Sequence, residues 1–297
     1  MGIRNLMKYI EYACRKTNLR DLDAQKRVVA IDTNCLIHKA LYTDQKVVIF
    51  IKRYVKLLRS LDFQVILVFD GLPNPTKAET NEKRVLRRRA YRDRANDLLK
   101  SGNVVEAMRM YRRCTTFSRE EVCELMYEMR KRSGVEVIEA PYEADAQLAF
   151  LATHGLAEFI ITEDSDLVVY GCEKIIFKLR LNGDCILYER NALNLPTTFE
   201  NFRKICILSG CDYLPGGLKG MGIKKGMRML SNNSCVDTLI DGENEEFTSK
   251  FKRAEDTFLY QIVYDPVNQT RCPLNPSEEV EEKSIEKSDL VENCAPQ

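Results

Sequence analysis

Two short apolar runs that end in aspartate decide the fold class: residues 28–32 read VVAID and residues 65–70 read VILVFD. Similar runs occur at residues 135–138 (VEVI), 159–161 (FII) and 175–177 (IIF). Their apolar residues are mostly consecutive, which is typical of strands covered on both faces. Helical patterns at residues 47–61, 119–132 and 142–154 alternate with them. This alternation predicts an α/β fold with a mostly parallel central sheet flanked by helices.

The composition excludes several classes of protein. The chain has 297 residues, 44% of them apolar, which suits one large domain or two smaller ones and not a disordered chain. No apolar run approaches the roughly 18–20 residues of a membrane span, and the opening MGIRNLMKYI has no secretory apolar region. The eleven cysteines form no CxxC pair and there are only two histidines, which disfavours a disulfide scaffold and a zinc finger.

The net charge of +1 averages two segments of opposite sign. Residues 77–94 hold eight basic side chains, Arg87 and Arg88 among them, against three acidic ones. Such a stretch suits capture of nucleic-acid phosphates, although a solvated charged helix has the same composition. Residues 277–297 hold seven acidic side chains against two lysines. We expect an acidic, disordered tail from residue 266 onward.

Acidic side chains stand at the ends of the predicted strands or at the start of the helix that follows, and they comprise Asp32, Asp70, Glu143, Asp145, Asp164, Asp166 and Asp212. Because the carboxyl ends of parallel strands meet at one edge of a sheet, we expect these side chains to converge. Clustered carboxylates need cations, and oxygen ligands favour Mg²⁺, with Mn²⁺ as a substitute. Two such ions about 4 Å apart suit phosphodiester hydrolysis. Each aspartate alone could equally be a turn former or a helix cap.

A glycine-rich segment, LKGMGIKKG at residues 218–226, offers a second phosphate contact through Gly220, Gly222, Lys224 and Lys225. Glycines let backbone N–H groups approach a phosphate at the start of a helix. A plain glycine turn before a helix is an equally good interpretation of this segment.

Six strings in order resemble the XPG/flap-endonuclease superfamily of structure-specific 5′ nucleases, and its exonuclease branch in particular: MGIRNL (1–6), VVAIDTNCLIHKA (28–40), VILVFDG (65–71), APYEADAQLAFL (140–151), ITEDSDLVVYGC (161–172) and LSGCDYLPG with KGMGIKKG (208–226). The resemblance implies a nuclease domain at residues 1–265 with a PIN-like fold, a basic helical arch at 74–113 and a helix–two-turn–helix duplex-binding region at 205–235. Residues 266–297 would follow it as a tail.

The resemblance also implies roles for named residues. Asp32, Asp70, Glu143 and Asp145 would serve one metal ion, and Asp164, Asp166 and Asp212 the second. Lys77 and Arg84 stand where the arch of the family presents a lysine and an arginine to the scissile phosphate. Gly2 would allow close approach to the active site, and His38 would wedge against DNA bases. K⁺ could bind the helix–two-turn–helix region.

The acidic cluster together with the resemblance implies a Mg²⁺-dependent 5′→3′ double-stranded DNA exonuclease with 5′-flap endonuclease activity, which would be monomeric and nuclear and would act in DNA repair or recombination. Its partner would be DNA with 5′ ends, nicks or flaps. Two alternatives stay open: a flap endonuclease with little exonuclease activity, and a non-catalytic binder of DNA junctions. A PIN-like ribonuclease would share the acidic sheet edge but would not need the basic arch.

Overall fold

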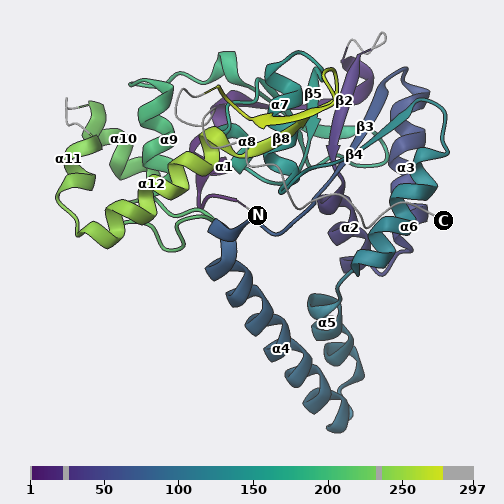
Figure 1. Ribbon diagram of the computed structural model, residues 1–297. Coiled ribbons are helices and arrows are strands. Elements are labelled where there is room, and N and C mark those ends of the chain that lie inside the picture. The colour runs from purple at the N-terminus through teal and green to yellow at the C-terminus, as the bar shows by residue number, and fades with distance from the viewer. Residues whose placement is uncertain (1, 23–26, 232–235, 277–297) are drawn as a thin grey trace.

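The computed structural model describes residues 2–22, 27–231 and 236–276 (Figure 1). Its strands are β1 (Cys14–Asn18), β2 (Val28–Asp32), β3 (Gln64–Phe69), β4 (Val135–Glu139), β5 (Phe159–Ile161), β6 (Lys174–Phe177), β7 (Asp184–Glu189), β8 (Ile262–Asp265) and β9 (Thr270–Pro273). Its α-helices are α1 (Leu6–Tyr9), α2 (Thr33–Tyr42), α3 (Val47–Ser60), α4 (Ala78–Lys100), α5 (Val104–Cys114), α6 (Arg119–Arg130), α7 (Ala144–Thr153), α8 (Asp166–Val169), α9 (Phe199–Leu208), α10 (Ile223–Ser231), α11 (Val236–Asp241) and α12 (Glu245–Tyr260).

A seven-stranded sheet forms the centre of the molecule, in the order β1-β7-β6-β5-β2-β3-β4. The strands from β6 to β4 run parallel, whereas β7 is antiparallel to both β6 and β1. The predicted fold class, a mostly parallel sheet flanked by helices, is therefore confirmed. Because β2 lies between β5 and β3, the carboxyl ends of these three strands are adjacent.

Side chains of the central strands point alternately to two hydrophobic layers. Ala30, Ile66 and Ile160 join the layer that includes residues of α7, α8 and α9. Val29 and Ile31 join the opposite layer, which includes residues of α2, α3 and α6. Both faces of the sheet are therefore buried, which explains why the strands read as nearly continuous apolar runs. Figure 1 shows the two groups of helices on either side of the sheet.

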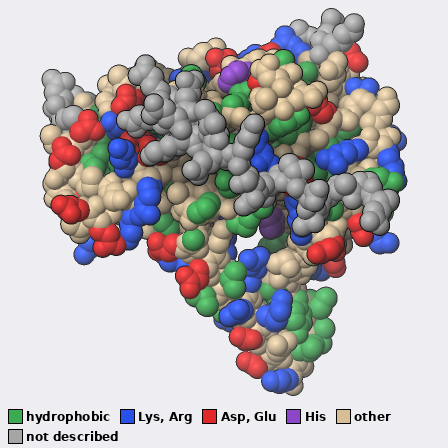
Figure 2. Space-filling view, in the orientation of Figure 1, with side chains coloured by type: hydrophobic (Ala, Val, Ile, Leu, Met, Phe, Trp, Pro, Cys, Tyr) green, Lys and Arg blue, Asp and Glu red, His purple; other side chains and the backbone are tan. Residues whose placement is uncertain are grey.

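Helices α4 and α5 form a hairpin that projects from the body of the protein (Figure 1). Most of α4 is solvated, and Ala95 is its buried residue. The buried face of α5 contains Ala107, Met110 and Cys114. The hairpin, with the 3₁₀ helix Pro75–Lys77 at its base, occupies the segment predicted as a basic helical arch, residues 74–113, and ends one residue beyond it at Cys114. Figure 2 shows Lys and Arg side chains along it.

Some elements were not predicted from the sequence. Strand β1 is half exposed and polar, and β7 pairs antiparallel and begins with an exposed residue, so neither has the signature of a buried parallel strand. The tail boundary expected at residue 266 is too early, because β8 pairs with β9 and Leu274 is buried. Residues 277–297, the acidic part of the predicted tail, lie outside the described residues. None of the described helices is long and apolar enough to cross a lipid bilayer.

Candidate active site

The carboxyl ends of β2, β3 and β5 bring three of the predicted acids to one edge of the sheet. Asp32 is the last residue of β2, and Asp70 directly follows β3. Asp164 comes shortly after β5, which pairs in parallel with β2. The parallel register of these strands therefore places side chains from distant parts of the chain side by side, as the sequence predicted.

Asp32 is the most firmly held of these acids. It is 5% exposed, and its carboxylate accepts hydrogen bonds from Cys35 N (3.1 Å), Cys35 Sγ (2.7 Å) and Thr162 Oγ1 (2.9 Å). The Thr162 hydroxyl in turn accepts a hydrogen bond from Asp164 N at 3.0 Å. The ends of β2 and β5 are thus linked through one hydroxyl, which holds two acids in register.

The start of α7 adds two more acids. Ala144 N donates to Asp70 Oδ1 at 2.7 Å, so the carboxylate of Asp70 satisfies a free N–H group at the beginning of the helix. Glu143 occupies the N-cap position of α7, and Asp145 lies in its first turn. The hydrogen bond therefore brings Glu143 and Asp145 to the end of β3.

The N-terminal segment closes against Asp164 and Asp166. Ile3 N donates to Asp166 Oδ1 at 3.0 Å, and Asp166 N donates to Asp164 Oδ1 at 3.0 Å. A Cβ atom at Gly2, whose φ is +89°, would overlap Asp164 Oδ1 and Ser165. The structure therefore places Gly2 against the acids, where a side chain does not fit.

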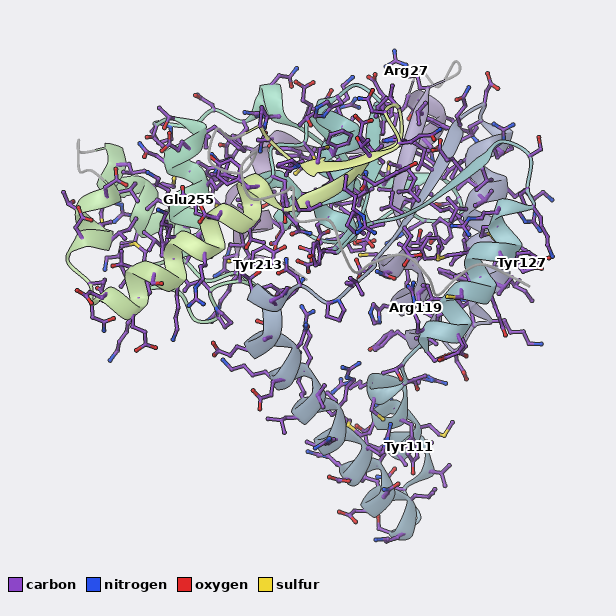
Figure 3. All side chains as sticks on the ribbon, in the orientation of Figure 1. Arg27, Tyr111, Arg119, Tyr127, Tyr213 and Glu255 are labelled. Atoms are coloured by element: carbon purple, nitrogen blue, oxygen red, sulfur yellow. The ribbon has the colours of Figure 1, made fainter. Side chains whose placement is uncertain are left out.

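Two cations from the base of the hairpin reach the acids. Lys77 Nζ pairs with Glu143 Oε1 and lies 3.0 Å from Asp212 Oδ2, and Arg84 donates to the same oxygen at 2.6 Å. Thr80 also donates to the backbone oxygen of Asp212 at 2.7 Å. Figure 3 shows Tyr213, the neighbour of Asp212, beneath α12 at the upper end of α4. The first turns of α4 are thereby attached to the acidic site.

The pKa shifts confirm that the acids act on one another. Desolvation by the surrounding protein is the main reason that the pKa of Asp70 is raised to about 6. The charges of Asp32 and Glu143 raise this pKa further, whereas the hydrogen bond from Ala144 N opposes the shift. Burial, followed by the charges of Asp164 and Asp32, raises the pKa of Asp145 well above its ordinary value. Each carboxylate thus experiences the charge of others in the same site.

The remaining shifts extend the cluster to the last acid. Burial and the charges of Asp164 and Asp212 raise the pKa of Asp166. Burial alone would raise the pKa of Asp212, but Lys77 and Arg84 hold it below its ordinary value. The pKa of Lys77 is raised, because the charges of Glu143, Asp145 and Asp212 outweigh its burial. All seven predicted acids therefore belong to one electrostatic cluster.

The donor set suits a hard divalent cation. Carboxylate oxygens predominate, and burial raises the pKa of the nearby Cys35 thiol, so this sulfur stays protonated. The ammonium of Lys77 already occupies a position between Glu143 and Asp212, where positive charge is stabilised. Among the described residues, no three His, Cys, Asp or Glu side chains are grouped closely enough to hold a metal ion as they stand. Carboxylates are the ligands that Mg²⁺ and Mn²⁺ prefer, so the chemistry of the site fits either ion. In this structure the ammonium of Lys77 neutralises two of the acids, Glu143 and Asp212.

Three of the predicted DNA-contacting residues, His38, Arg87 and Arg88, lie on α2 and α4, the helices that follow Asp32 and Lys77. His38 on α2 is accessible to solvent at its surface, but neighbouring side chains partly desolvate its ring. This desolvation lowers the pKa of His38 against the charge of Asp32, and the charges of Arg84 and Arg88 lower it further. Arg87 is exposed and Arg88 half-buried on α4, and neither has a carboxylate partner within the part of the chain described. The charge of Arg88 therefore reaches the His38 ring, whereas Arg87 is an exposed cation on the same helix.

Gly220, Gly222, Lys224 and Lys225 form a second surface, before and within the first turn of α10. Lys225 Nζ donates to Gly220 O at 3.2 Å, and both lysines are exposed. Together with Asn5 and Lys8, the residues at the start of α10 line a hollow of about 390 Å³. The structure does not bring this surface into contact with the seven acids.

Sequence reasoning missed several residues that hold the site together. Thr162, Cys35, Asn74 and Tyr213 bind or support the acids through neutral hydrogen bonds. Asn74 precedes Pro75, a pattern that signals a helix cap, and Tyr213 adjoins Asp212. Neither position indicates by itself which carboxylate it reaches, because the partners come from distant segments.

Comparison with known proteins identifies the family. The XPG N-terminal domain matches residues 1–91, and the XPG I-region matches residues 134–212. "Exonuclease 1" of Drosophila melanogaster is 35% identical over 99% of this chain, which covers 44% of the fly protein. "DNA damage-inducible protein DIN7" of Saccharomyces cerevisiae is 30% identical over 93% of this chain, which covers 69% of that protein.

A solved structure supports the fold. The catalytic core of Rad2 in complex with DNA substrate superposes with a TM-score of 0.64 at 20% identity, over 95% of this chain and 93% of the other. This likeness concerns the fold alone. The two matching domains and the curated relatives show that the chain belongs to the XPG/flap-endonuclease superfamily of nucleases and resembles its exonuclease 1 branch.

Proposed function

We propose that this chain is a Mg²⁺-dependent 5′→3′ double-stranded DNA exonuclease that also cuts 5′ flaps, and that it acts as a monomer in DNA repair or recombination in the nucleus. One observation carries the proposal: seven carboxylates share one electrostatic cluster at the base of the basic hairpin, where Lys77 and Arg84 contact two of them. Such a pairing of acids and bases suits a site that binds metal ions and a phosphate together. The names of the relatives, exonuclease 1 among them, support the same activity.

The proposed metal ligands divide between two sides of the site. Asp32, Asp70, Glu143 and Asp145 would hold one Mg²⁺, and Asp164, Asp166 and Asp212 the other, with Mn²⁺ as a possible replacement. The ions would polarise a water and neutralise charge on the phosphate and on the leaving oxygen. The protein contributes a rigid edge, since hydrogen bonds from Cys35, Thr162 and Ala144 fix the acids before substrate arrives.

The cations of the hairpin have a complementary role. In this arrangement Lys77 and Arg84 neutralise Glu143 and Asp212. With substrate bound, the same ammonium and guanidinium groups would bind the phosphate oxygens instead and stabilise their charge in the transition state. Arg87 and Arg88 would bind the backbone farther along α4, and His38 would contact bases near the cut.

The surface at the start of α10 would bind the duplex away from the cut. No atom lies within 4 Å of the position that a Cβ would occupy at Gly220 or Gly222, and Lys224 and Lys225 are exposed beside them. This segment would bind phosphates through backbone N–H groups and ammonium groups. A K⁺ ion held by backbone carbonyls in the same turn is part of the proposal.

The test is digestion of 5′- and 3′-labelled duplexes in Mg²⁺, with Asp166→Ala as the inactive variant. Asp166 is 3% exposed and belongs to the acid cluster, so its removal should abolish cleavage while leaving DNA binding, measured in Ca²⁺, largely intact. The control is Asp265→Ala, an acid on the β8–β9 hairpin, which should cut normally. Full activity of Asp166→Ala would overturn the metal assignment.

The same assay separates the alternatives. Blunt, recessed and flapped duplexes of equal length distinguish an exonuclease from a flap endonuclease with little exonuclease action. A chain that binds junctions but makes no Mg²⁺-dependent cut would be a non-catalytic binder of the same fold. The intact set of seven acids favours the catalytic alternatives.

A further inference from the structure

A buried asparagine connects the acidic site to the base of the hairpin. Asn74 lies between β3 and α4 and is 8% exposed, although Pro73 and Pro75 on either side are exposed. Its Nδ2 donates to Glu143 Oε2 at 3.1 Å and to Gln261 Oε1 at 3.1 Å. Its Oδ1 accepts a hydrogen bond from Thr76 N at 3.0 Å. Both ends of one carboxamide are therefore used, each toward a different part of the site.

The two oxygens of Glu143 have different environments. Oε2 accepts hydrogen bonds from Asn74 Nδ2 and from Tyr213 Oη, the latter at 2.7 Å. Oε1 faces the ammonium of Lys77. Neutral donors thus hold one oxygen in place, while the other is directed at the position of positive charge. Neutral donors orient a carboxylate without supplying a charge that would compete with a cation.

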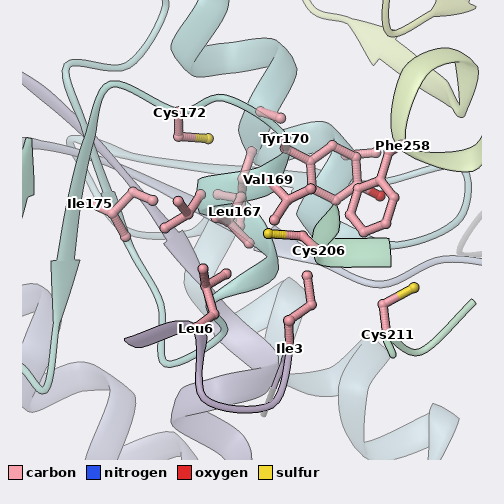
Figure 4. Close-up of a cluster of buried hydrophobic side chains, with 14 of the residues drawn as sticks. Ile3, Leu6, Leu167, Val169, Tyr170, Cys172, Ile175, Cys206, Cys211 and Phe258 are labelled. Atoms are coloured by element: carbon pink, nitrogen blue, oxygen red, sulfur yellow. The ribbon is translucent and has the colours of Figure 1, made fainter. Parts of the chain in front are cut away.

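The donors are themselves held by the hydrophobic core. Because the single proton of Tyr213 is given to Glu143, Tyr170 donates to Tyr213 across 2.9 Å. The ring of Phe258, on α12, packs against Tyr170 at 4.8 Å and Tyr213 at 5.0 Å between ring centroids. Figure 4 shows Tyr170 and Phe258 in contact within the core. Packing of α12 therefore restricts the side chains that orient Glu143.

The other end of Asn74 sets the path of the chain into the hairpin. Its Oδ1 caps the 3₁₀ helix Pro75–Lys77, which ends at the lysine that faces Glu143. Thr257 of α12 also donates to Thr76 at 3.1 Å, which ties the same turn to the body. One amide group thereby determines the orientation of the acid and the starting position of its cationic partner.

We propose that Asn74 is a positioning residue for cleavage: it fixes Glu143 Oε2 so that Oε1 faces the metal site, and its cap on residues 75–77 places Lys77 opposite that oxygen. Gln261 supports the role by accepting the second hydrogen of the amide. This inference rests on the proposed function, because it concerns the metal and phosphate chemistry of the same acids.

The decisive variant is Asn74→Asp. Aspartate keeps the oxygen that caps residues 75–77 but replaces the N–H donor with an oxygen facing Glu143. We expect the Mg²⁺ concentration for half-maximal cleavage to rise about 10–100-fold, as is usual when a group that orients a metal ligand is lost. DNA binding in Ca²⁺ should change by less than about twofold, because phosphate contacts are left in place.

A second readout does not depend on cleavage. The rise in melting temperature on adding Mn²⁺ without DNA should be smaller in Asn74→Asp than in the unaltered chain, since weaker metal binding stabilises the folded state less. Asn191→Asp is the matched control. Asn191 is exposed and follows the end of β7. The end of β7 pairs with the beginning of β6, whereas the acids lie at the carboxyl ends of the parallel strands, so Asn191 is on the opposite side of the sheet.

Gln261→Leu keeps the proposal testable if Asn74→Asp folds poorly. Gln261 Nε2 is buried without a hydrogen-bond partner among the described residues, so the apolar substitution removes one unsatisfied donor. It also removes Oε1, which accepts hydrogen bonds from Asn74 Nδ2 at 3.1 Å and from Tyr170 Oη at 3.5 Å. We expect a several-fold higher Mg²⁺ requirement, because the amide of Asn74 loses one of its two acceptors. A purely structural role would lower the melting temperature without metal and leave the Mg²⁺ requirement unchanged.

The outcomes separate this inference from the proposed function. If Asn74→Asp and Gln261→Leu show the Mg²⁺ requirement and the Mn²⁺-induced stabilisation of the unaltered chain, Asn74 is not a positioning residue. If the unaltered chain binds Mn²⁺ but cuts no DNA, the proposed function fails, and the melting experiment still decides the role of Asn74.

Discussion

Lys77 Nζ lies 3.0 Å from Asp212 Oδ2, although the two residues belong to segments far apart in the chain. The same ammonium pairs with Glu143, so one cation neutralises acids from both proposed metal sites. Positive charge is already stabilised at this position before any ion binds. Uptake of a metal ion by these acids therefore requires Lys77 to share or give up its place.

Replacing Lys77 by alanine should separate metal binding from chemistry. The single-turnover rate should fall about 10²–10³-fold, because a charged donor that stabilises the transition state is lost. The Mg²⁺ requirement should not rise and is expected to fall, because the acids lose the cation that competes with the ion. A Mg²⁺ titration of single-turnover cleavage measures both effects.

Lys83→Ala is the control for that experiment. Lys83 lies on α4, in the helix that follows Lys77; it is exposed and pairs with Glu79 instead of an acid of the site. Lys83→Ala should change the single-turnover rate and the Mg²⁺ requirement by less than about twofold, since exposed ion pairs contribute little. An unchanged rate in Lys77→Ala would remove Lys77 from the chemistry.

Gly2→Ala should damage the site more than it damages the fold. The added Cβ would overlap Asp164 and Ser165, and the positive φ adds strain of about 1–2 kcal/mol. We expect cleavage to drop by more than tenfold, because Ile3 N must move from Asp166. Gly155 also has a positive φ, but no atom lies within 4 Å of the Cβ that alanine would add. Gly155→Ala should therefore lower the stability of the protein and leave cleavage unchanged. Equal activity in the two variants would show that Gly2 has no special place at the site.

The charges of α4 should appear in the salt dependence of DNA binding. Arg87 and Arg88 have no carboxylate partners among the described residues, so each is free to bind a phosphate. In the double variant Arg87→Ala/Arg88→Ala, the slope of log K against log salt should decrease by about 1–2, because each phosphate contact contributes roughly 0.9. Lys131→Ala, which removes a lysine paired with Glu128, should leave the slope unchanged. An unaltered slope in the double variant would place the DNA elsewhere.

Without metal ions, the protein should become less stable as the pH rises from about 4 to about 6. The pKa of Asp70 is raised to about 6, and those of Asp145, Asp164 and Asp166 are also raised. In this range the folded state therefore binds more protons than the unfolded state, whose aspartates titrate near 3.9, and the free energy of unfolding decreases with pH. The lowered pKa of Asp212 acts in the opposite sense, but below about pH 4.

Melting temperatures in EDTA across this pH range check the sign. Asp70→Asn should reduce the slope, because the substituted side chain does not titrate. Added Mg²⁺ should reverse the trend, since metal binding requires the ionised acids. A melting temperature that rises with pH in EDTA would contradict the shared desolvation of the acids.

The strands that carry the acids were predictable because both of their faces are buried. Continuous apolar runs ending in Asp32 and Asp70 have few other interpretations, and parallel pairing then requires the acids to meet. Strands β1 and β7 were not predicted. β1 lies at the edge of the sheet with part of its surface in water, and β7 pairs antiparallel with β6, so neither reads as a continuous apolar run. Their pairing depends on distant partners and leaves no clear local pattern.

The amino-acid sequence by itself determined the fold class, the set of seven acids and the basic segment above them. These properties follow from residue type and spacing, which are local. Only the tertiary structure decided which oxygen each donor reaches: that Lys77 lies between Glu143 and Asp212, and that Asn74 holds the other oxygen of Glu143. Such contacts depend on the packing of α12 and on the direction in which α4 leaves the body, which many residues far apart in the chain determine together.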